Sequence, residues 1–212
     1  MKKICLLVAI LSMCIVLTSP ANAAIIDVNC AADGDGAIVM DPVDATHDFS
    51  WTPTGLEGGI ETYTLTMDGA QYSAPAHVEG DFTANSELDP IVWIIEDVDN
   101  ATGFTWTGYQ FNIFMTKPFT ITGVVAPIGW TYTTPTVSSG QTWPHSTVTG
   151  WMGSVTYTAG SGYEIENSET GEFGLRVKFD GSVAFCTEQI PTPEPMTIAM
   201  LGLGGLLIRR KK

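Results

Sequence analysis

The part of the chain between Ala24 and Ile190 has almost no positive charge. Its only basic residues are Lys117, Arg176 and Lys178, whereas it contains 22 of the 23 acidic residues of the chain. A surface with this excess of carboxylates repels phosphate groups, which excludes nucleic acid as a partner and makes anionic lipids poor ones. Such a field favours mutual repulsion between copies in solution, or attraction of divalent cations.

Cysteine is also scarce. Cys5 and Cys14 lie in an N-terminal apolar segment, so only Cys30 and Cys186 remain for the rest of the chain. In an oxidising compartment this pair predicts a disulfide, which by loop entropy would contribute about 5 kcal/mol. Two free thiols are the alternative. No second Cys or His stands beside either cysteine at the spacing of a zinc site.

Motifs of catalysis are missing. The sequence has no Gly-x-Ser-x-Gly turn and no glycine-rich phosphate loop ahead of a helix. Its histidines, His47, His77 and His145, lie in loop-like sequence. Glu164 and Glu166 would share a strand face, but a solvated face explains such pairs better than glycoside cleavage does. We therefore expect a protein that is not an enzyme and has no cofactor.

The N-terminus has the parts of a secretory signal. Lys2 and Lys3 are followed by an apolar stretch from Ile4 to Leu17, and Ala21-Asn22-Ala23 fits the rule for signal-peptidase cleavage. Residues 1–23 are therefore predicted to be a signal peptide, with the secretion translocon and signal peptidase as partners. A retained membrane anchor is the alternative, although the apolar stretch is shorter than the ~20 residues of a spanning helix.

The C-terminus, residues 191–212, combines a proline-rich spacer, an apolar run and a basic end. The run from Met196 to Ile208 would, as a helix, cover about 20 Å of a roughly 30 Å hydrocarbon core, which makes it a poor permanent anchor. The basic end should stay in the cytoplasm and is formed by Arg209, Arg210, Lys211 and Lys212. This pattern predicts transient anchoring in the inner membrane.

The tripeptide Pro193-Glu194-Pro195, the apolar run and the basic end, in this order, resemble the PEP-CTERM sorting signal. The resemblance covers residues 191–212 only. It implies that an exosortase-type transpeptidase removes the tail in a Gram-negative-type bacterium. It also implies export to the cell surface or to an exopolysaccharide matrix. An ordinary C-terminal tail anchor is the alternative.

Between the two ends, alternation of apolar and polar residues predicts β-strands and no helix. The predicted strands lie near 63–67, 91–95, 109–115, 120–125, 130–133, 151–157, 173–179 and 183–185. Turn residues separate them, and Asp180-Gly181 predicts a hairpin. We therefore expect an all-β fold, a two-sheet antiparallel sandwich of the Ig-like or jelly-roll-like kind, over residues 61–190. Residues 24–60 are rich in Asp and Gly and are predicted to be irregular, as a strap or a short edge hairpin.

Two kinds of residue are candidates for binding. Acidic loops make weak calcium candidates of Asp33, Asp35, Asp97 and Asp99, although neither loop completes an EF-hand and metal-free acidic turns are commoner. Exposed tryptophans would form a glycan platform, for which the loop-like candidates are Trp106, Trp130 and Trp143. Large aromatic side chains usually fill the core instead.

The sequence as a whole predicts an exported, non-enzymatic protein of the cell surface or exopolysaccharide matrix with a structural or adhesive role. The first alternative is a carbohydrate-binding sandwich that contacts extracellular polysaccharide through those tryptophans. The second, weaker alternative is a secreted hydrolase.

Overall fold

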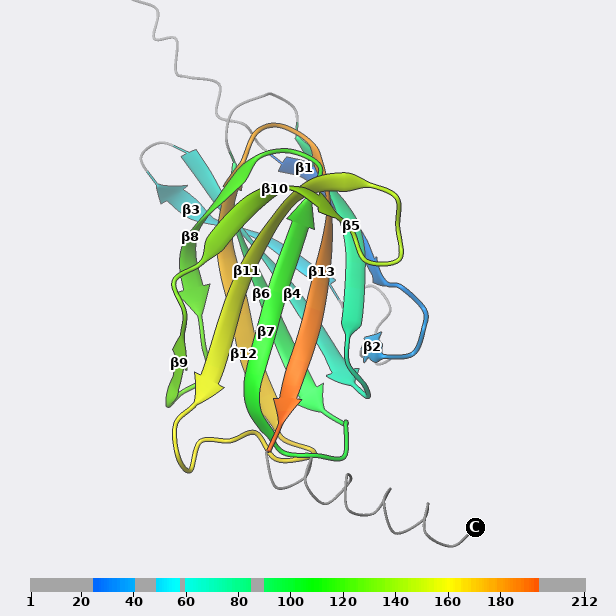
Figure 1. Cartoon of the computed structure of the whole chain (residues 1–212). Helices are drawn as coiled ribbons and strands as arrows, with labels where there is room; N and C mark the ends of the chain where they lie inside the picture. Colours follow the sequence, from blue (N-terminus) through cyan, green and yellow to red (C-terminus); the bar gives the residue numbers. More distant parts are fainter. Residues whose placement is uncertain (1–24, 41–48, 58–59, 85–89, 195–212) are drawn as a thin grey trace, which may run out of the picture.

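The computed structural model describes residues 25–40, 49–57, 60–84 and 90–194, and the regular secondary structure of these ranges is all β-strand. The strands form two sheets (Figure 1). Sheet A runs in the order β1 (Ile25–Ala32), β5 (Ala76–Ala84), β13 (Val183–Pro193), β7 (Trp106–Met115), β11 (Thr149–Ala159) and β10 (Thr136–Thr142), and β9 (Trp130–Tyr132) also pairs with β11. Sheet B runs in the order β2 (Ile38–Met40), β4 (Ile60–Gln71), β6 (Ile91–Asn100), β12 (Thr170–Phe179) and β8 (Phe119–Val125), and β3 (Phe49–Glu57) pairs with β4.

The strand pairs are antiparallel, apart from β4 and β6, which run parallel. The chain can place these two strands side by side because β5, which lies between them in sequence, belongs to the other sheet. The all-β prediction and the two mostly antiparallel sheets are confirmed.

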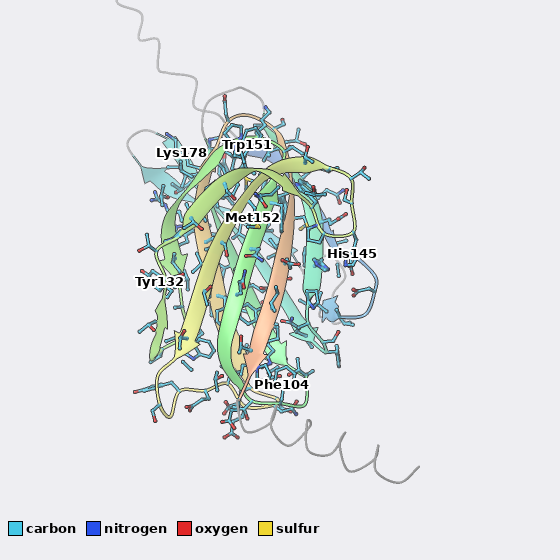
Figure 2. All side chains as sticks on the ribbon, viewed as in Figure 1. Phe104, Tyr132, His145, Trp151, Met152 and Lys178 are labelled. Atoms are coloured by element: carbon cyan, nitrogen blue, oxygen red, sulfur yellow. The ribbon has the colours of Figure 1, made fainter. Side chains whose placement is uncertain are left out.

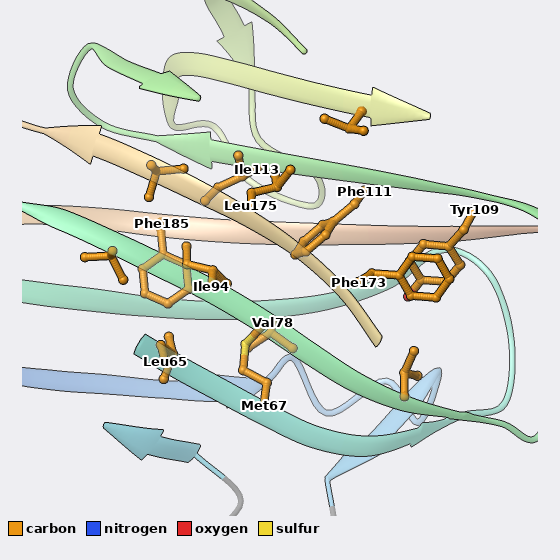
Figure 3. Close-up of a cluster of buried hydrophobic side chains, with 14 of the residues drawn as sticks. Leu65, Met67, Val78, Ile94, Tyr109, Phe111, Ile113, Phe173, Leu175 and Phe185 are labelled. Carbon is orange, nitrogen blue, oxygen red and sulfur yellow. The ribbon is translucent and has the colours of Figure 1, made fainter. Parts of the chain in front are cut away.

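The core lies between the two sheets and is built from the alternation seen in the sequence. In β12, Phe173, Leu175 and Val177 are fully buried, and the residues between them are polar or glycine. β7 contributes Tyr109, Phe111 and other side chains of the same face, and β5, β6 and β13 add to the same cluster. Figure 3 shows the ring of Tyr109 from sheet A stacked on the ring of Phe173 from sheet B, with 4.0 Å between ring centroids. Because one cluster draws on both sheets, they pack face to face as a sandwich.

The N-terminal part of the domain is more regular than predicted. β1, β2 and β3 all lie within residues 24–60, and β1 pairs with β5 along most of its length. The prediction of an irregular strap is therefore wrong for the described residues of this stretch. The alternative of an edge hairpin agrees with β3, which pairs with β4 only. Asp33, Gly34, Asp35 and Gly36 of this stretch form the loop between β1 and β2, which leads the chain from sheet A to sheet B.

The predicted hairpin at Asp180-Gly181 is also wrong. The turn is present, and Gly181 has the positive φ of +60° that such turns require of a glycine. It joins β12 of sheet B to β13 of sheet A, so the strands on either side of it are not paired with each other.

The proline-rich spacer predicted at the C-terminal end begins inside the sheet. β13 continues to Pro193 and pairs there with β7. Its pairing with β5 ends at Gln189, so Pro191 and Pro193 lie where β13 has one partner, the position in which a sheet tolerates proline. The predicted signal peptide and the residues from Pro195 to Lys212 lie outside the described residues. Within the described part of the chain, no helix has the length and apolar character needed to cross a membrane.

Candidate metal-binding site

A row of polar side chains crosses the outer face of sheet A. The strand register puts Glu188 of β13 between His77 of β5 and Asn112 of β7. All three point away from the core because inward and outward residues alternate along each strand. Asn112 Nδ2 donates a hydrogen bond to Glu188 Oε2 at 2.7 Å, and His77 Nε2 lies 3.4 Å from Glu188 Oε1. Glu188 thus offers one carboxylate oxygen to each neighbour.

The loop of residues 33–36, which follows β1, continues this row on the side of β5 away from β13. The amide of Asp33 donates to the carbonyl of His77 at 3.2 Å, which fixes the loop to the strand. Asp33 Oδ1 accepts from the amide of Asp35, and Asp35 Oδ1 accepts from the amide of Ala37. The two glycines of the loop have φ of +85° and +82°, a conformation that side chains with a Cβ rarely adopt. The loop therefore holds both carboxylates by one oxygen each.

The imidazole of His77 lies between two acids and is 2% exposed. Its Nε2 faces Glu188 and its Nδ1 faces Asp33 Oδ2, each at 3.4 Å. Nδ1 makes no hydrogen bond to any described residue. Desolvation acts to raise the pKa of the Asp33 carboxyl, but hydrogen bonds from Asp35 and the nearby imidazole outweigh it, so the pKa is lowered. Asp33 is therefore a carboxylate at neutral pH.

The loop between β10 and β11 covers this part of the outer face. Trp143 of this loop is 7% exposed and packs with Phe114 and Cys186, which point outward from β7 and β13. The ring of His145, which Figure 2 labels, meets the ring of His77 edge-on, with 4.9 Å between centroids. His77 is buried because this loop closes over a sheet face that solvent would otherwise reach.

Three side chains at the end of the row offer metal ligands. One nitrogen of His77 and one oxygen each of Asp33 and Asp35 lie within 4.8 Å of one another. Comparisons of the chain with protein-family models, curated proteins and solved structures found no match. The chemistry of the site therefore follows from its own atoms. Imidazole with carboxylate is a donor set that suits divalent transition-metal ions.

The four acids predicted as weak calcium candidates do not form one group. Asp33 and Asp35 lie beside His77, whereas Asp97 and Asp99 lie on the outer face of β6 in sheet B. Asp97 stands between Asp68 of β4 and Glu172 of β12 in the strand register. Partial burial, together with the charge of Glu172, raises the pKa of the Asp97 carboxyl. Among the described residues, this second group is an acidic surface without a nitrogen ligand.

The three tryptophans predicted as a glycan platform are buried, so that prediction is wrong. Trp106, Trp130 and Trp143 are 0%, 8% and 7% exposed. The indole N–H of Trp106 donates to Thr102 Oγ1 at 2.9 Å, and that of Trp130 donates to the carbonyl of Tyr163 at 2.6 Å. These bonds satisfy the indole N–H of Trp106 and of Trp130 inside the fold. The indole N–H of Trp143 is buried without a hydrogen-bond partner among the described residues. In the described part of the chain, the aromatic side chains that are about half exposed are Tyr72, Tyr132 and Tyr163.

The predicted disulfide between Cys30 and Cys186 is also wrong, since both are free thiols. β5 lies between their strands, and two strand spacings amount to about 10 Å, beyond the ~7 Å that a disulfide spans between Cα atoms. The side chains also point to opposite faces of sheet A. Cys30 packs against the main core beside Gly80, whereas Cys186 belongs to the small outer cluster with Phe114 and Trp143.

We expect the two thiols to be unreactive as long as the protein is folded. Burial raises the pKa of each to about 12, and the thiolate is the reactive form. Ellman's reagent should label them at least roughly a hundredfold more slowly in the native protein than in urea. Reduction should change neither the melting temperature nor the intact mass. A mass gain of two hydrogens on reduction would show a disulfide and contradict the structure.

Alternation of outward and inward residues indicates that His77 lies on a strand, although the nearby proline suggests a loop. His77 was placed in a loop because it follows Pro75, yet it is the second residue of β5. From there, His77, Glu79 and Asp81 alternate with Val78 and Phe82, the two faces of a strand at the sheet surface. The neighbourhood of His77 and Glu188 depends on the pairing of β5 with β13, about which local sequence says nothing.

Proposed function

We propose that this chain is an exported, non-enzymatic protein of the cell surface or of an exopolysaccharide matrix, with a structural or adhesive role. The secretion translocon and signal peptidase would deliver it, and an exosortase-type transpeptidase would release it from transient anchoring in the inner membrane. The sandwich would be of the Ig-like or jelly-roll-like kind.

The extent of the folded domain is the observation that carries this proposal. β1 begins at Ile25, two residues beyond the predicted cleavage after Ala23. β13 ends at Pro193, the first residue of the Pro-Glu-Pro tripeptide. The sheets thus occupy the interval between the two predicted signals and overlap the second one only at residues 191–193 of β13. Removal of residues 1–23 and of the tail after the tripeptide would leave every described strand in place.

The surface chemistry supports the same role. Three acids stand next to one another across three strands of sheet B, namely Asp68, Asp97 and Glu172. The part of the chain between Ala24 and Ile190 has only three basic residues. Such a surface keeps copies apart in solution and attracts cations. Both properties suit a protein that works at high local concentration outside the cell.

The sorting tripeptide would be read directly beside the sandwich. The amide of Glu194 donates to the carbonyl of Thr105 at 3.2 Å, and Pro193 is paired with Trp106. No spacer therefore separates the last strand from the tripeptide. In the anchored state, the end of the domain that carries Thr105 would face the membrane.

Replacement of Glu194 by alanine tests the proposal without breaking the fold, because the hydrogen bond at this residue is made by its backbone. We expect the Glu194→Ala chain to keep its tail and remain in the membrane fraction of the native host. Thr192→Ala, an exposed change two residues earlier, is the matched control and should be processed normally. Intact-mass measurement and cell fractionation read out both. Normal tail removal and surface delivery of Glu194→Ala would defeat the sorting proposal.

A further inference from the structure

We propose that Asp33, Asp35 and His77 form a binding site for a divalent transition-metal ion such as zinc. The two acids come from the loop after β1, and the histidine comes from the outward face of β5. Their ligand atoms lie within 4.8 Å of one another. Atoms that share one zinc ion at about 2.0–2.2 Å lie roughly 3 to 4 Å apart, so the exposed carboxylates need only small adjustments.

The observation that points to a cation is Nδ1 of His77, which is buried and has no hydrogen-bond partner among the described residues. Nε2 faces the carboxylate of Glu188, which Asn112 holds in place with a 2.7 Å hydrogen bond. With its proton on Nε2, a neutral imidazole directs the lone pair of Nδ1 at the carboxylate of Asp33, 3.4 Å away. Two lone pairs facing each other at this distance repel unless a proton or a metal ion lies between them. A carboxylate behind a metal-ligating imidazole is also the usual outer-shell arrangement in metal sites.

The donor set selects the class of ion. Calcium and magnesium take oxygen ligands, and calcium needs six to eight of them. One imidazole nitrogen with two carboxylate oxygens suits zinc and its first-row neighbours, for which three protein ligands and a water complete a tetrahedral shell. Asp33 and Asp35 each keep one carboxylate oxygen outside the bonds that shape the loop.

The ion would fasten the connection between the two sheets. The loop that carries both acids leads from β1 of sheet A to β2 of sheet B, and apart from the ion it is tied to β5 by the hydrogen bond from Asp33 to the carbonyl of His77. An ion that binds the folded chain and not the unfolded chain stabilises the folded chain by mass action. The proposal therefore predicts a zinc-dependent rise in melting temperature.

Zinc titration of the purified chain by calorimetry and thermal shift tests the site. We expect one zinc ion per chain and a higher melting temperature, with calcium binding at least about tenfold more weakly. Asp33→Asn and Asp35→Asn are exposed changes and should each weaken zinc binding at least about tenfold. Asp180→Asn, an exposed acid in the turn between β12 and β13, is the matched control and should bind as the wild type does. Absence of zinc binding, equal loss in all three variants, or equal affinity for calcium would overturn the proposal.

Long-range ¹H–¹⁵N spectra of the imidazoles identify the nitrogen ligand. The chain has three histidines, so His47→Gln and His145→Gln assign the signals and leave His77 in place. We expect zinc to shift Nδ1 of His77 far more than Nε2, and we expect the His145→Gln variant to retain zinc binding. A doubly protonated His77 that bridges Asp33 and Glu188 and ignores zinc would overturn the proposal, as would loss of binding in His145→Gln.

Discussion

Replacement of Phe173 by alanine is expected to destabilise the domain by about 4 kcal/mol, since truncation of a buried phenylalanine removes its packing and leaves a cavity. The side chain is 0% exposed and lies at the meeting point of the two sheets. Its ring stacks on Tyr109 with 4.0 Å between centroids and meets Trp130 and Tyr157 edge-on at 5.5 and 5.1 Å. One side chain of sheet B thus contacts rings from three strands of sheet A.

The expected loss is a large part of a typical domain stability of about 5–15 kcal/mol. Urea unfolding followed by tryptophan fluorescence measures it, and the buried Trp130 makes the signal sensitive to this site. Phe104→Ala is the matched control, because Phe104 is half-buried at the margin of the same core and should lose about 1 kcal/mol. A smaller loss for Phe173→Ala than for Phe104→Ala would contradict the packing described.

The position of Phe173 was readable from the sequence, and so was most of the core. Alternation in 173–179 and in 109–115 predicted which residues face inward, and those residues are buried. This succeeds because a strand with one wet face must alternate, whichever strands lie beside it. Alternation along one strand does not show which other strand it pairs with. Asp180-Gly181 was therefore recognised as a turn, but its role in passing the chain from one sheet to the other was not.

The errors about the candidate sites have the same origin. Trp130 and Trp143 stand next to glycine and proline in sequence, which indicates loops. Trp130 instead begins β9 of sheet A, and the loop of Trp143 closes over the outer face of that sheet, so both rings are buried. The strands of Cys30 and Cys186 do come near each other, as a disulfide would require, yet β5 lies between them. The contact of His77 with Asp33 and Glu188 likewise joins three distant parts of the chain. Only the arrangement of strands brings such residues together or keeps them apart.

Glu96 is another residue whose role depends on the strand arrangement. It continues the inward series of Val92 and Ile94 in β6 and is 1% exposed between the sheets. The hydroxyl of Tyr109 lies 3.3 Å from Glu96 Oε2 and 3.1 Å from Gln71 Oε1. A tyrosine has one proton to donate, so it cannot serve both acceptors. A protonated Glu96 that donates to the Tyr109 oxygen leaves the tyrosine proton for Gln71 and completes the chain of bonds.

The pKa of Glu96 agrees with a protonated carboxyl at this position. Burial raises the pKa of Glu96 from 4.5 to about 8, although bonds from Tyr109 and Gln189 act in the opposite direction. Because the folded pKa lies above the unfolded one, the contribution of Glu96 to stability is fully present below pH 4.5. It is lost as the pH rises through about 8. Each unit of pKa difference corresponds to about 1.4 kcal/mol, so the loss over this window is several kcal/mol.

Glu96→Gln should therefore make the protein more stable above neutral pH, because an amide can donate to the Tyr109 oxygen without ever becoming charged. We expect the variant to lie within about 1 kcal/mol of the wild type at pH 5 and to exceed it by roughly 3 to 5 kcal/mol at pH 9. Urea unfolding at pH 5, 7 and 9 measures the difference. Glu166→Gln removes an exposed carboxyl from a loop and should leave the pH profile of the wild type unchanged. If the difference between Glu96→Gln and the wild type is the same at all three pH values, Glu96 is not held protonated in the core, and the bond chain through Tyr109 to Gln71 has to be reassigned.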